Sequence, residues 1–294
     1  MEGFLRINAE CACGIHRGVF SGLRKGTSQS KSADRTARKI KNMKQRVFIT
    51  GAAGTVGSAL WQAWEKQDAY TLTLMDINPI TGANSRVAQA DIRDYAAMQE
   101  LCRDQDVLVH LAYVRQDSLG KVPGEVSDIG ASMTLFEAAR EAGIQKIIYA
   151  STNHVSGWNE RLNSPPRFST GDQFRPDGWY GAMKGMAEIA GRYLVDAHDM
   201  RFISIRIGSF NGTYEPSGIR HCSTLLTPRD CVQLFGLAVD YEGPVKYLIT
   251  YGRSANSDGY QQSYLDISGA VEVLGYQPQD NLVKTHLRRF LSEF

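Results

Sequence analysis

The chemistry that this sequence offers centres on a tyrosine and a lysine four residues apart, Tyr180 and Lys184. On a helix, side chains with this spacing project from the same face. The lysine ammonium would lower the pKa of the phenol, so that the tyrosine can act as a base near neutral pH. Such a pair is common by chance, but here a glycine-rich segment precedes it, at residues 51–57. Together, the two motifs predict an enzyme that holds a dinucleotide and moves a hydride.

The glycine-rich segment follows a short apolar run and reads Gly-Ala-Ala-Gly-Thr-Val-Gly. In a strand-turn-helix unit, Gly51 would allow the tight turn, Gly54 would let the backbone approach a pyrophosphate, and Gly57 would let the helix pack on the sheet. The helix that begins here, with Thr55 and Val56 in its first turn, offers N–H groups and a partial positive charge to the phosphates. The alternative is a structural turn in another kind of α/β protein.

An acidic residue at the end of the next strand pattern indicates which dinucleotide is bound. Asp76 lies 19 residues after the last of the three glycines, where a carboxylate would bind both hydroxyls of the adenosine ribose and repel a 2′-phosphate. No Arg or Lys lies among the glycines, so NAD is predicted rather than NADP. Asp91 and Ile92 are expected at the adenine edge, and Leu111 and Ala112, after the third strand, are expected to line the cofactor site.

The elements that must position these residues follow from an alternation of patterns along the chain. Strand patterns occur at residues 46–50, 70–75, 107–111, 146–150, 202–207 and 247–251. Helical patterns occur after Gly54, at residues 94–103, 125–142, 179–197, 227–239 and 267–274, and at the C-terminus. This alternation predicts an α/β fold, a Rossmann-like doubly wound parallel sheet with helices on both faces. A small, loop-rich C-terminal part, mainly residues 209–294, would cover the substrate.

Composition and charge exclude several classes of function. The 294 residues are 43% hydrophobic but contain no run of 18 apolar residues, which argues against a transmembrane helix. Residues 1–42 hold nine basic and three acidic side chains, a net charge of +6, so the remaining 24 basic and 28 acidic side chains give a net charge of −4. The body of the chain therefore gives no reason to expect nucleic-acid binding. The five cysteines lack metal-ligand spacing, which indicates a reducing cytoplasm and no metal site.

The basic N-terminal segment is expected to lie outside the folded part. Residues 21–42 are small, polar and charged, a composition that favours disorder. We therefore expect residues 1–42 to be a disordered extension or the product of a misassigned start, and residues 43–294 to form one NAD-binding domain. A basic interaction arm is an alternative, as is a transit peptide, although Glu2 and Glu10 argue against the latter.

Several longer stretches resemble the extended short-chain dehydrogenases/reductases of the NAD-dependent epimerase/dehydratase family, and within it the uronate dehydrogenases and related archaeal sugar and sugar-phosphate dehydrogenases. The stretches are Ala-Ser-Thr-Asn-His at 150–154, Arg-Pro-Asp-Gly-Trp-Tyr-Gly-Ala-Met-Lys at 175–184, Arg-Ile-Gly-Ser at 206–209, Arg-His-Cys-Ser-Thr at 220–224, Ser-Ala-Asn at 254–256, and Leu-Gly-Tyr-Gln-Pro-Gln-Asp-Asn at 274–281. The resemblance runs from about residue 43 to about residue 281. The Asn-His pair and the last stretch are its narrowest markers.

The resemblance implies a reaction and the residues that perform it. Tyr180 would be the general base, Lys184 would tune it and hold the nicotinamide ribose, and Thr152 would orient the substrate oxygen. The implied reaction is oxidation of a sugar, most simply a hexuronate, at its anomeric carbon to a lactone. One departure lies in the long helix before the fourth strand, where the family often has Asn and this chain has Asp128.

The resemblance also implies which residues bind the sugar. Asn153 and His154 would contact sugar hydroxyls, and Ser209 and Arg220 would bind the far end of the substrate, where a guanidinium suits a carboxylate. Arg115 stands where a small polar residue is expected near the substrate. This second arginine indicates either a more anionic substrate, such as a sugar phosphate, or a solvated loop.

Three alternatives to a uronate dehydrogenase remain. The first is a dehydrogenase of a neutral or phosphorylated sugar. The second is a nucleotide-sugar epimerase or dehydratase, which would need more C-terminal structure than the 110 residues that follow Lys184. The third is a non-catalytic NAD-sensing regulator, which need not keep Thr152 and Tyr180. In each case the family resemblance implies a homo-oligomer that associates through helices flanking the sheet.

Overall fold

The computed structural model describes residues 44–114, 128–162, 167–257 and 263–291, with side chains as far as residue 286. Lys44–Phe294 forms one compact unit. The expectations for residues 1–42 and for Arg115 concern parts of the chain outside the described residues. Among the helices of the described part, none has both the length and the apolar character needed to cross a membrane.

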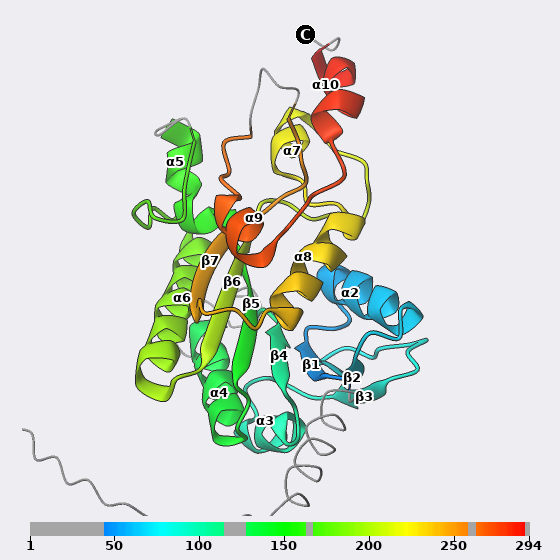
Figure 1. The fold of residues 1–294 in the computed structure, drawn as a ribbon, viewed down its shortest axis with the longest axis vertical. Coiled ribbons are helices and arrows are strands. Elements are labelled where there is room, and N and C mark those ends of the chain that lie inside the picture. The colour runs from blue at the N-terminus through cyan, green and yellow to red at the C-terminus, as the bar shows by residue number, and fades with distance from the viewer. Residues whose placement is uncertain (1–43, 115–127, 163–166, 258–262, 292–294) are drawn as a thin grey trace, which may run out of the picture. The chain divides into compact units, whose positions relative to one another are not determined.

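A sheet of seven parallel strands forms the centre of this unit, in the order β3-β2-β1-β4-β5-β6-β7 (Figure 1). The strands are β1 (Arg46–Thr50), β2 (Thr71–Asp76), β3 (Arg86–Gln89), β4 (Val107–His110), β5 (Lys146–Thr152), β6 (Arg201–Ile207) and β7 (Tyr247–Gly252). The predicted doubly wound, Rossmann-like sheet is confirmed. Because β1 pairs with β2 on one side and β4 on the other, the winding reverses here, and ligands in such folds bind beside the carboxyl ends of these strands.

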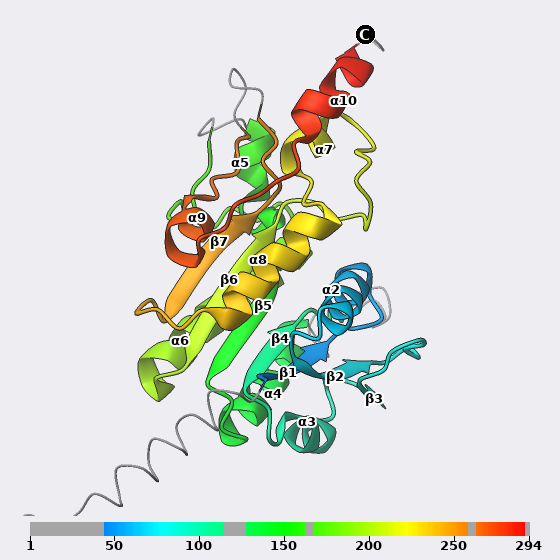
Figure 2. The ribbon, with the colours of Figure 1, turned by 45° about the vertical axis from the view of Figure 1, so that its right-hand side comes forward.

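Helices cover both faces of the sheet (Figures 1 and 2). One face packs against α2 (Thr55–Lys66), α8 (Pro228–Asp240) and α9 (Ser268–Leu274). The other face packs against α3 (Tyr95–Cys102), α4 (Asp128–Glu141) and α6 (Trp179–His198). The shorter elements are the 3₁₀ helix η2 (Asn153–Ser156), α5 (Gly157–Leu162), α7 (Ile219–Thr224) and α10 (Leu282–Leu291). Of these, η2 and α5 follow directly on β5, so they lie at the edge of the sheet where a ligand is expected.

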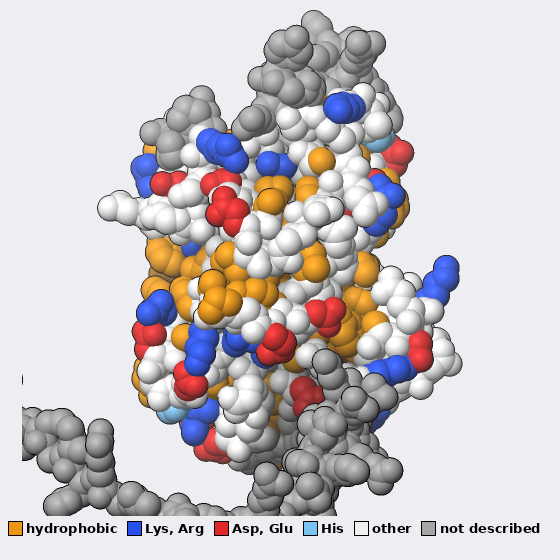
Figure 3. Space-filling model, in the orientation of Figure 1, with side chains coloured by type: hydrophobic (Ala, Val, Ile, Leu, Met, Phe, Trp, Pro, Cys, Tyr) orange, Lys and Arg blue, Asp and Glu red, His pale blue; other side chains and the backbone are white. Residues whose placement is uncertain are grey.

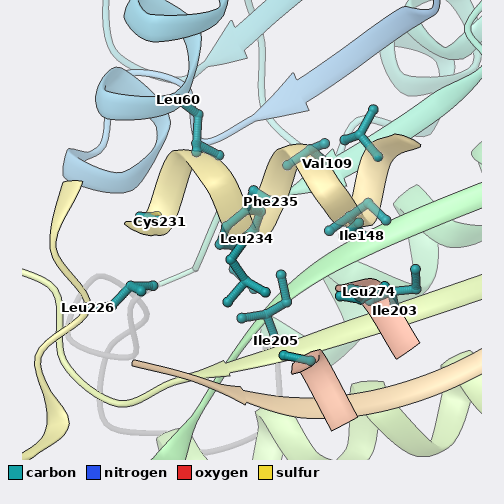
Figure 4. Packing of buried hydrophobic residues seen from close by; sticks show 14 of the residues in the cluster. Leu60, Val109, Ile148, Ile203, Ile205, Leu226, Cys231, Leu234, Phe235 and Leu274 are labelled. Carbon is teal, nitrogen blue, oxygen red and sulfur yellow. The ribbon is translucent and has the colours of Figure 1, made fainter. Parts of the chain in front are cut away.

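The hydrophobic core consists of one layer on each face of the sheet. Figure 4 shows the layer under α8, where Cys231, Leu234 and Phe235 point toward strand side chains such as Val109 and Ile205. All five are fully buried, and burial of each large apolar side chain stabilises the fold by about 1.5–3 kcal/mol. A parallel sheet covered on both faces needs nearly continuous apolar strands, which explains the short apolar runs in the sequence.

The elements that the sequence did not predict are short or exposed. The strand β3 lies at the edge of the sheet with mostly exposed side chains, so it carries no apolar alternation. The segment between β5 and α6 was expected to be a loop, but it contains η2 and α5. These two short elements carry residues that contact the candidate site, as described next.

Candidate active site

The glycine-rich loop joins β1 to α2, as its sequence predicts. Gly51 has a φ of +73°, and a Cβ added there would lie 2.6 Å from the backbone nitrogen of Ala112. A Cβ at Gly57 would lie 2.4 Å from the carbonyl oxygen of Gly51, because α2 starts close against the loop. No side chain caps the N-terminus of α2 and its first turn has no acidic residue. Its N–H groups and partial positive charge are therefore available to a phosphate.

Asp76, at the end of β2, lies against this loop and is 8% exposed. Its Oδ2 accepts a hydrogen bond from the Ala53 backbone nitrogen (3.0 Å), and its Oδ1 accepts one from Asn78 (2.9 Å). These contacts hold the carboxylate at the place where the sequence predicts a ribose. The Asp91 carboxylate is paired with Arg93, whose hydrogen bonds lower the pKa of Asp91.

A pocket of about 720 Å³ extends along the glycine loop and the end of β2. This pocket is lined by eight of the residues predicted to bind the cofactor: Gly51, Gly54, Thr55, Asp76, Asp91, Ile92, Leu111 and Ala112. It combines N–H donors at a helix N-terminus, the carboxylate of Asp76 and an apolar wall. These are the groups that the adenosine and phosphate part of NAD requires, so the residues present fit this cofactor.

A second pocket, of about 490 Å³, adjoins the first, and Leu111 and Tyr113 line both. The residues predicted for catalysis and for the substrate that line it are Thr152, Asn153, His154, Tyr180, Lys184, Ser209 and Arg220, and Val56 of the glycine loop lines it too. Apart from Val56, which lies in the first turn of α2, they come from the ends of β5 and β6 and from the helices that follow these strands. The fold thus brings together side chains from five separate segments of the chain.

Tyr180 lies in the first turn of α6, with its ring edge-on to Tyr113 at 4.8 Å. Burial raises the pKa of Tyr180 to about 12, while a hydrogen bond with the Thr152 hydroxyl lowers it and the nearby Asp128 raises it. The lowering of this pKa by Lys184 stays a prediction. Lys184 has a carboxylate partner of its own, Asp128.

Lys184 is 2% exposed, and its Nζ lies 3.6 Å from Asp128 Oδ2 and 4.8 Å from the centre of the Tyr149 ring. Burial lowers the pKa of Lys184, and Asp128 raises it. Asp128 is fully buried and accepts a hydrogen bond from the Val114 backbone nitrogen (2.9 Å). Asp128 therefore places a carboxyl group directly beside Lys184.

At the other end of the pocket, the residues predicted to bind substrate are hydrogen-bonded to one another. Arg220 donates from Nη1 to Ser209 Oγ (3.0 Å) and from Nη2 to Glu160 Oε2 (2.9 Å), and its Nε donates to Glu160 Oε1. The Asn153 amide fits with its oxygen accepting from Arg220 Nη2 (2.8 Å) and its nitrogen donating to the Gly208 carbonyl (2.8 Å). Asn153 is only 2% exposed, so it fixes Arg220 from the side of the sheet.

The two histidines near the site differ in their surroundings. His154 hydrogen-bonds through Nδ1 to the Asp177 carboxylate (3.0 Å), while its side chain remains 43% exposed at the pocket. His110 is fully buried between the hydroxyls of Thr50 (2.8 Å) and Ser132 (3.0 Å). His154 is thus placed to meet a ligand, and His110 is a hydrogen-bonded core residue.

The sequence did not single out Tyr113, Glu160 or Tyr264, all of which contact the site. The only signal for Glu160 was an acidic residue in a segment expected to be a loop. Tyr264 donates to Glu160 Oε1 (2.8 Å) across 104 residues of chain, a separation at which no local spacing connects two residues. Among the described residues, no group of three or more His, Cys, Asp or Glu side chains is placed to hold a metal ion.

Residues 47–227 match the NAD dependent epimerase/dehydratase family. The chain belongs to this family, and with the glycine loop and the Tyr180–Lys184 pair it is an NAD-dependent oxidoreductase.

Among curated proteins, the chain is 31% identical over 259 residues to an NAD-dependent glucose-6-phosphate dehydrogenase of Haloferax volcanii, covering 81% of this chain and 95% of that protein. It is 32% identical over 244 residues to a uronate dehydrogenase of Pseudomonas putida, covering 80% and 84%. Among solved structures, a mutant of uronate dehydrogenase from Agrobacterium tumefaciens, complexed with NAD, matches with a TM-score of 0.69 and 27% identity, over 84% of this chain and 89% of that one.

Proposed function

We propose that this protein oxidises a free cyclic sugar at its anomeric carbon to a lactone, with NAD as the hydride acceptor. The observation that carries the proposal is the junction of the two pockets. Tyr180, Lys184 and Thr152 line one pocket, the glycine loop lines the other, and Leu111 and Tyr113 belong to both. A small sugar in the pocket that Tyr180 lines would therefore lie next to the nicotinamide end of a dinucleotide in the pocket that the glycine loop lines.

Bound NAD supplies the acceptor for the hydride that leaves the anomeric carbon. Tyr180, as phenolate, removes the proton of the anomeric hydroxyl, and the Thr152 hydroxyl, which already hydrogen-bonds with Tyr180, orients the same oxygen. The Lys184 ammonium, which is buried, would favour the phenolate and would hold the nicotinamide ribose. Proton transfer of this kind contributes about a hundred- to ten-thousand-fold to the rate. The lactone then opens in water to the acid.

Two classes of sugar have support. The names of the bacterial relatives and the arginine at the far end of the pocket favour a hexuronate. The archaeal relatives are named for glucose 6-phosphate and L-arabinose, and Arg220 is already paired with Glu160. These two facts favour a sugar without a carboxylate.

The experiment is to follow NADH formation by purified protein with NAD and a panel of glucuronate, galacturonate, glucose, galactose, arabinose, xylose and glucose 6-phosphate. Turnover of any of these supports the proposal, and the best substrate identifies the class. A nucleotide-sugar epimerase would interconvert its substrate without releasing NADH. Tight NAD binding with no oxidation across the panel would identify a sensor and contradict the proposal.

We propose in addition that the protein acts as a homo-oligomer through the outer face of α6 and that it works in the cytoplasm. Exposed apolar side chains on that face support association. The cysteines of the described part, Cys102, Cys222 and Cys231, are buried free thiols, which suits a reducing compartment.

A further inference from the structure

Arg220 is the one arginine among the described residues that line the substrate pocket, and each nitrogen of its guanidinium donates a hydrogen bond to the protein. Nε and Nη2 both donate to the carboxylate of Glu160, and Nη1 donates to Ser209 Oγ (3.0 Å). The fork-like pairing with Glu160 uses the edge that would otherwise receive a substrate carboxylate. The hydrogen bond with Glu160 also raises the pKa of Arg220, so the arginine is charged but compensated.

Glu160 is fixed in this position from two sides. It lies on α5, and its Oε1 also accepts a hydrogen bond from the Tyr264 hydroxyl (2.8 Å). Burial alone would raise the pKa of Glu160, but the hydrogen bonds from Arg220 and Tyr264 lower it below its usual range. Glu160 is therefore ionised at neutral pH. It does not belong to the residues that line the pocket, so it acts on a substrate through Arg220.

The same compensation holds for the other basic side chains of this pocket. The Lys184 ammonium lies 3.6 Å from the Asp128 carboxylate, and the His154 ring is hydrogen-bonded to Asp177. Burial, with Arg220 nearby, lowers the pKa of His221, which favours the neutral imidazole. Within the described part of the chain, the pocket thus has no basic group whose charge is left for an anionic substrate.

We propose that Glu160 is a specificity-determining residue that makes this pocket favour sugars with a neutral far end over sugars with a carboxylate there. This rests on the proposed oxidation of a sugar by NAD. A substrate carboxylate would have to displace Glu160 from Arg220, leaving a partly buried carboxylate unpaired beside a second negative charge. A hydroxymethyl group requires no such displacement.

The test uses sugars that differ only at C6: galactose against galacturonate, and glucose against glucuronate. In the wild-type protein, kcat/KM is expected to be higher for the neutral member of each pair. Glu160→Gln keeps the size of the side chain and removes its charge. It should raise the ratio of uronate to neutral sugar by at least about tenfold, mainly through a lower KM for the uronate.

Two further variants show whether the change comes from the pair itself. Adding Arg220→Met to Glu160→Gln should abolish the gain, because the released guanidinium is what binds the uronate. Glu137→Gln removes a glutamate that is paired with Arg140 on α4, away from the pocket, and should leave the ratio unchanged. If Glu160→Gln unfolds, as judged by thermal melting, Glu160→Ala removes the same charge.

An unchanged ratio in a folded Glu160 variant would overturn the inference. So would a wild-type preference for uronates that Glu160→Gln abolishes, because Glu160 would then hold Arg220 ready for a carboxylate. If no sugar of the panel reduces NAD, the proposed function fails instead. Calorimetric binding of glucose and glucuronate to the wild-type protein and to Glu160→Gln then decides the role of Glu160 without turnover.

Discussion

As the proposed base, Tyr180 would have to lose a proton in a place where burial raises its pKa to about 12. The Thr152 hydroxyl works against this effect, and an oxidised nicotinamide, which is positively charged, would do so as well. We predict that Tyr180→Phe lowers kcat by about a hundred- to ten-thousand-fold, because the variant has no group that can accept the proton. NAD binding should be nearly unchanged, since the glycine loop and Asp76 remain.

Tyr95→Phe is a matched control for this variant. Tyr95 lies on α3 with the same exposed fraction as Tyr180, 37%, and its hydroxyl also has a protein partner, Glu141. Kinetics of NADH formation and calorimetric titration with NAD give the two readouts. Near-normal kcat in Tyr180→Phe would show that another group is the base.

A second prediction at the scale of single residues concerns Asp128 and the pH dependence of the rate. Its carboxylate raises the pKa of Tyr180, because a nearby negative charge disfavours the phenolate. Catalysis needs the phenolate, so kcat should rise with pH through the pKa of Tyr180. Asp128→Asn keeps the acceptor oxygen for the Val114 backbone nitrogen and removes the charge. The acidic limb of the kcat profile should therefore move to lower pH by about one unit.

The opposite shift has a distinct meaning. Asp128 also raises the pKa of Lys184, which burial lowers. Suppose instead that the acidic limb moved to higher pH in Asp128→Asn. Lys184 would then have lost its proton because its carboxylate partner was removed, and the role of Asp128 would be to keep Lys184 charged. That result would contradict the direct effect predicted here.

At the scale of elements, the catalytic helix α6 is fastened to β6 by a buried ion pair. Glu188 and Arg206 are 0% and 1% exposed, and their carboxylate and guanidinium meet at 2.7 Å and 3.0 Å, with Ser204 Oγ donating to Glu188 as well (2.9 Å). Removing one partner leaves a buried charge unpaired. We therefore predict that Arg206→Met lowers the free energy of unfolding by about 3–5 kcal/mol.

Denaturant unfolding of three variants checks this prediction. The double variant Arg206→Met, Glu188→Leu should recover much of the loss, because an apolar pair leaves no charge without a partner. Asp196→Asn breaks an exposed pair with Arg192 on the same helix and should change stability by less than about 1 kcal/mol. Equal losses in Arg206→Met and Asp196→Asn would contradict the role of burial.

The elements that could be predicted are those whose sequence repeats a physical period. The strand β5 is buried along its length, and α6 has a buried apolar stripe, so both are evident in the chain. The site residues at their ends, such as Thr152 and Tyr180, followed from these elements and the family motifs. Glu160 and Tyr264 did not, because their effect on Arg220 arises only when α5, α7 and the segment before α9 meet in three dimensions.

The two C-terminal stretches that resemble the family, residues 254–256 and 274–281, make contacts that stabilise the fold. The Asp230 carboxylate accepts hydrogen bonds from the backbone nitrogens of Gln279 (2.8 Å) and Asp280 (3.1 Å). Asn256 is fully buried and accepts one from the backbone nitrogen of Leu282 (3.2 Å). Asp230 thus fastens the chain after α9 onto α8, and Asn256 fastens it to the segment after β7. A narrow sequence marker of a family therefore need not touch its substrate.

For the whole molecule, the two faces of the sheet have different surroundings. On the side of α4 and α6, apolar side chains remain on the outside: Trp179, Met186, Ile189 and Tyr193 are 63%, 47%, 59% and 62% exposed. Their spacing along α6, seven, three and four residues, is that of a helix-packing seam. Figure 3 shows exposed hydrophobic side chains, coloured orange, among charged ones on one face of the molecule. A continuous apolar stripe on a long helix is typical of an interface.

We predict that the protein is an oligomer and that a charged side chain introduced into this stripe dissociates it. Ile189→Glu places a carboxylate in the middle of the seam, where association would bury it without a partner. Size-exclusion chromatography with light scattering should show a smaller species than the wild type at equal concentration. Val271→Glu is the control, because Val271 is 44% exposed on α9, which packs on the opposite face of the sheet. A wild-type monomer, or equal dissociation by both variants, would contradict assembly through α6.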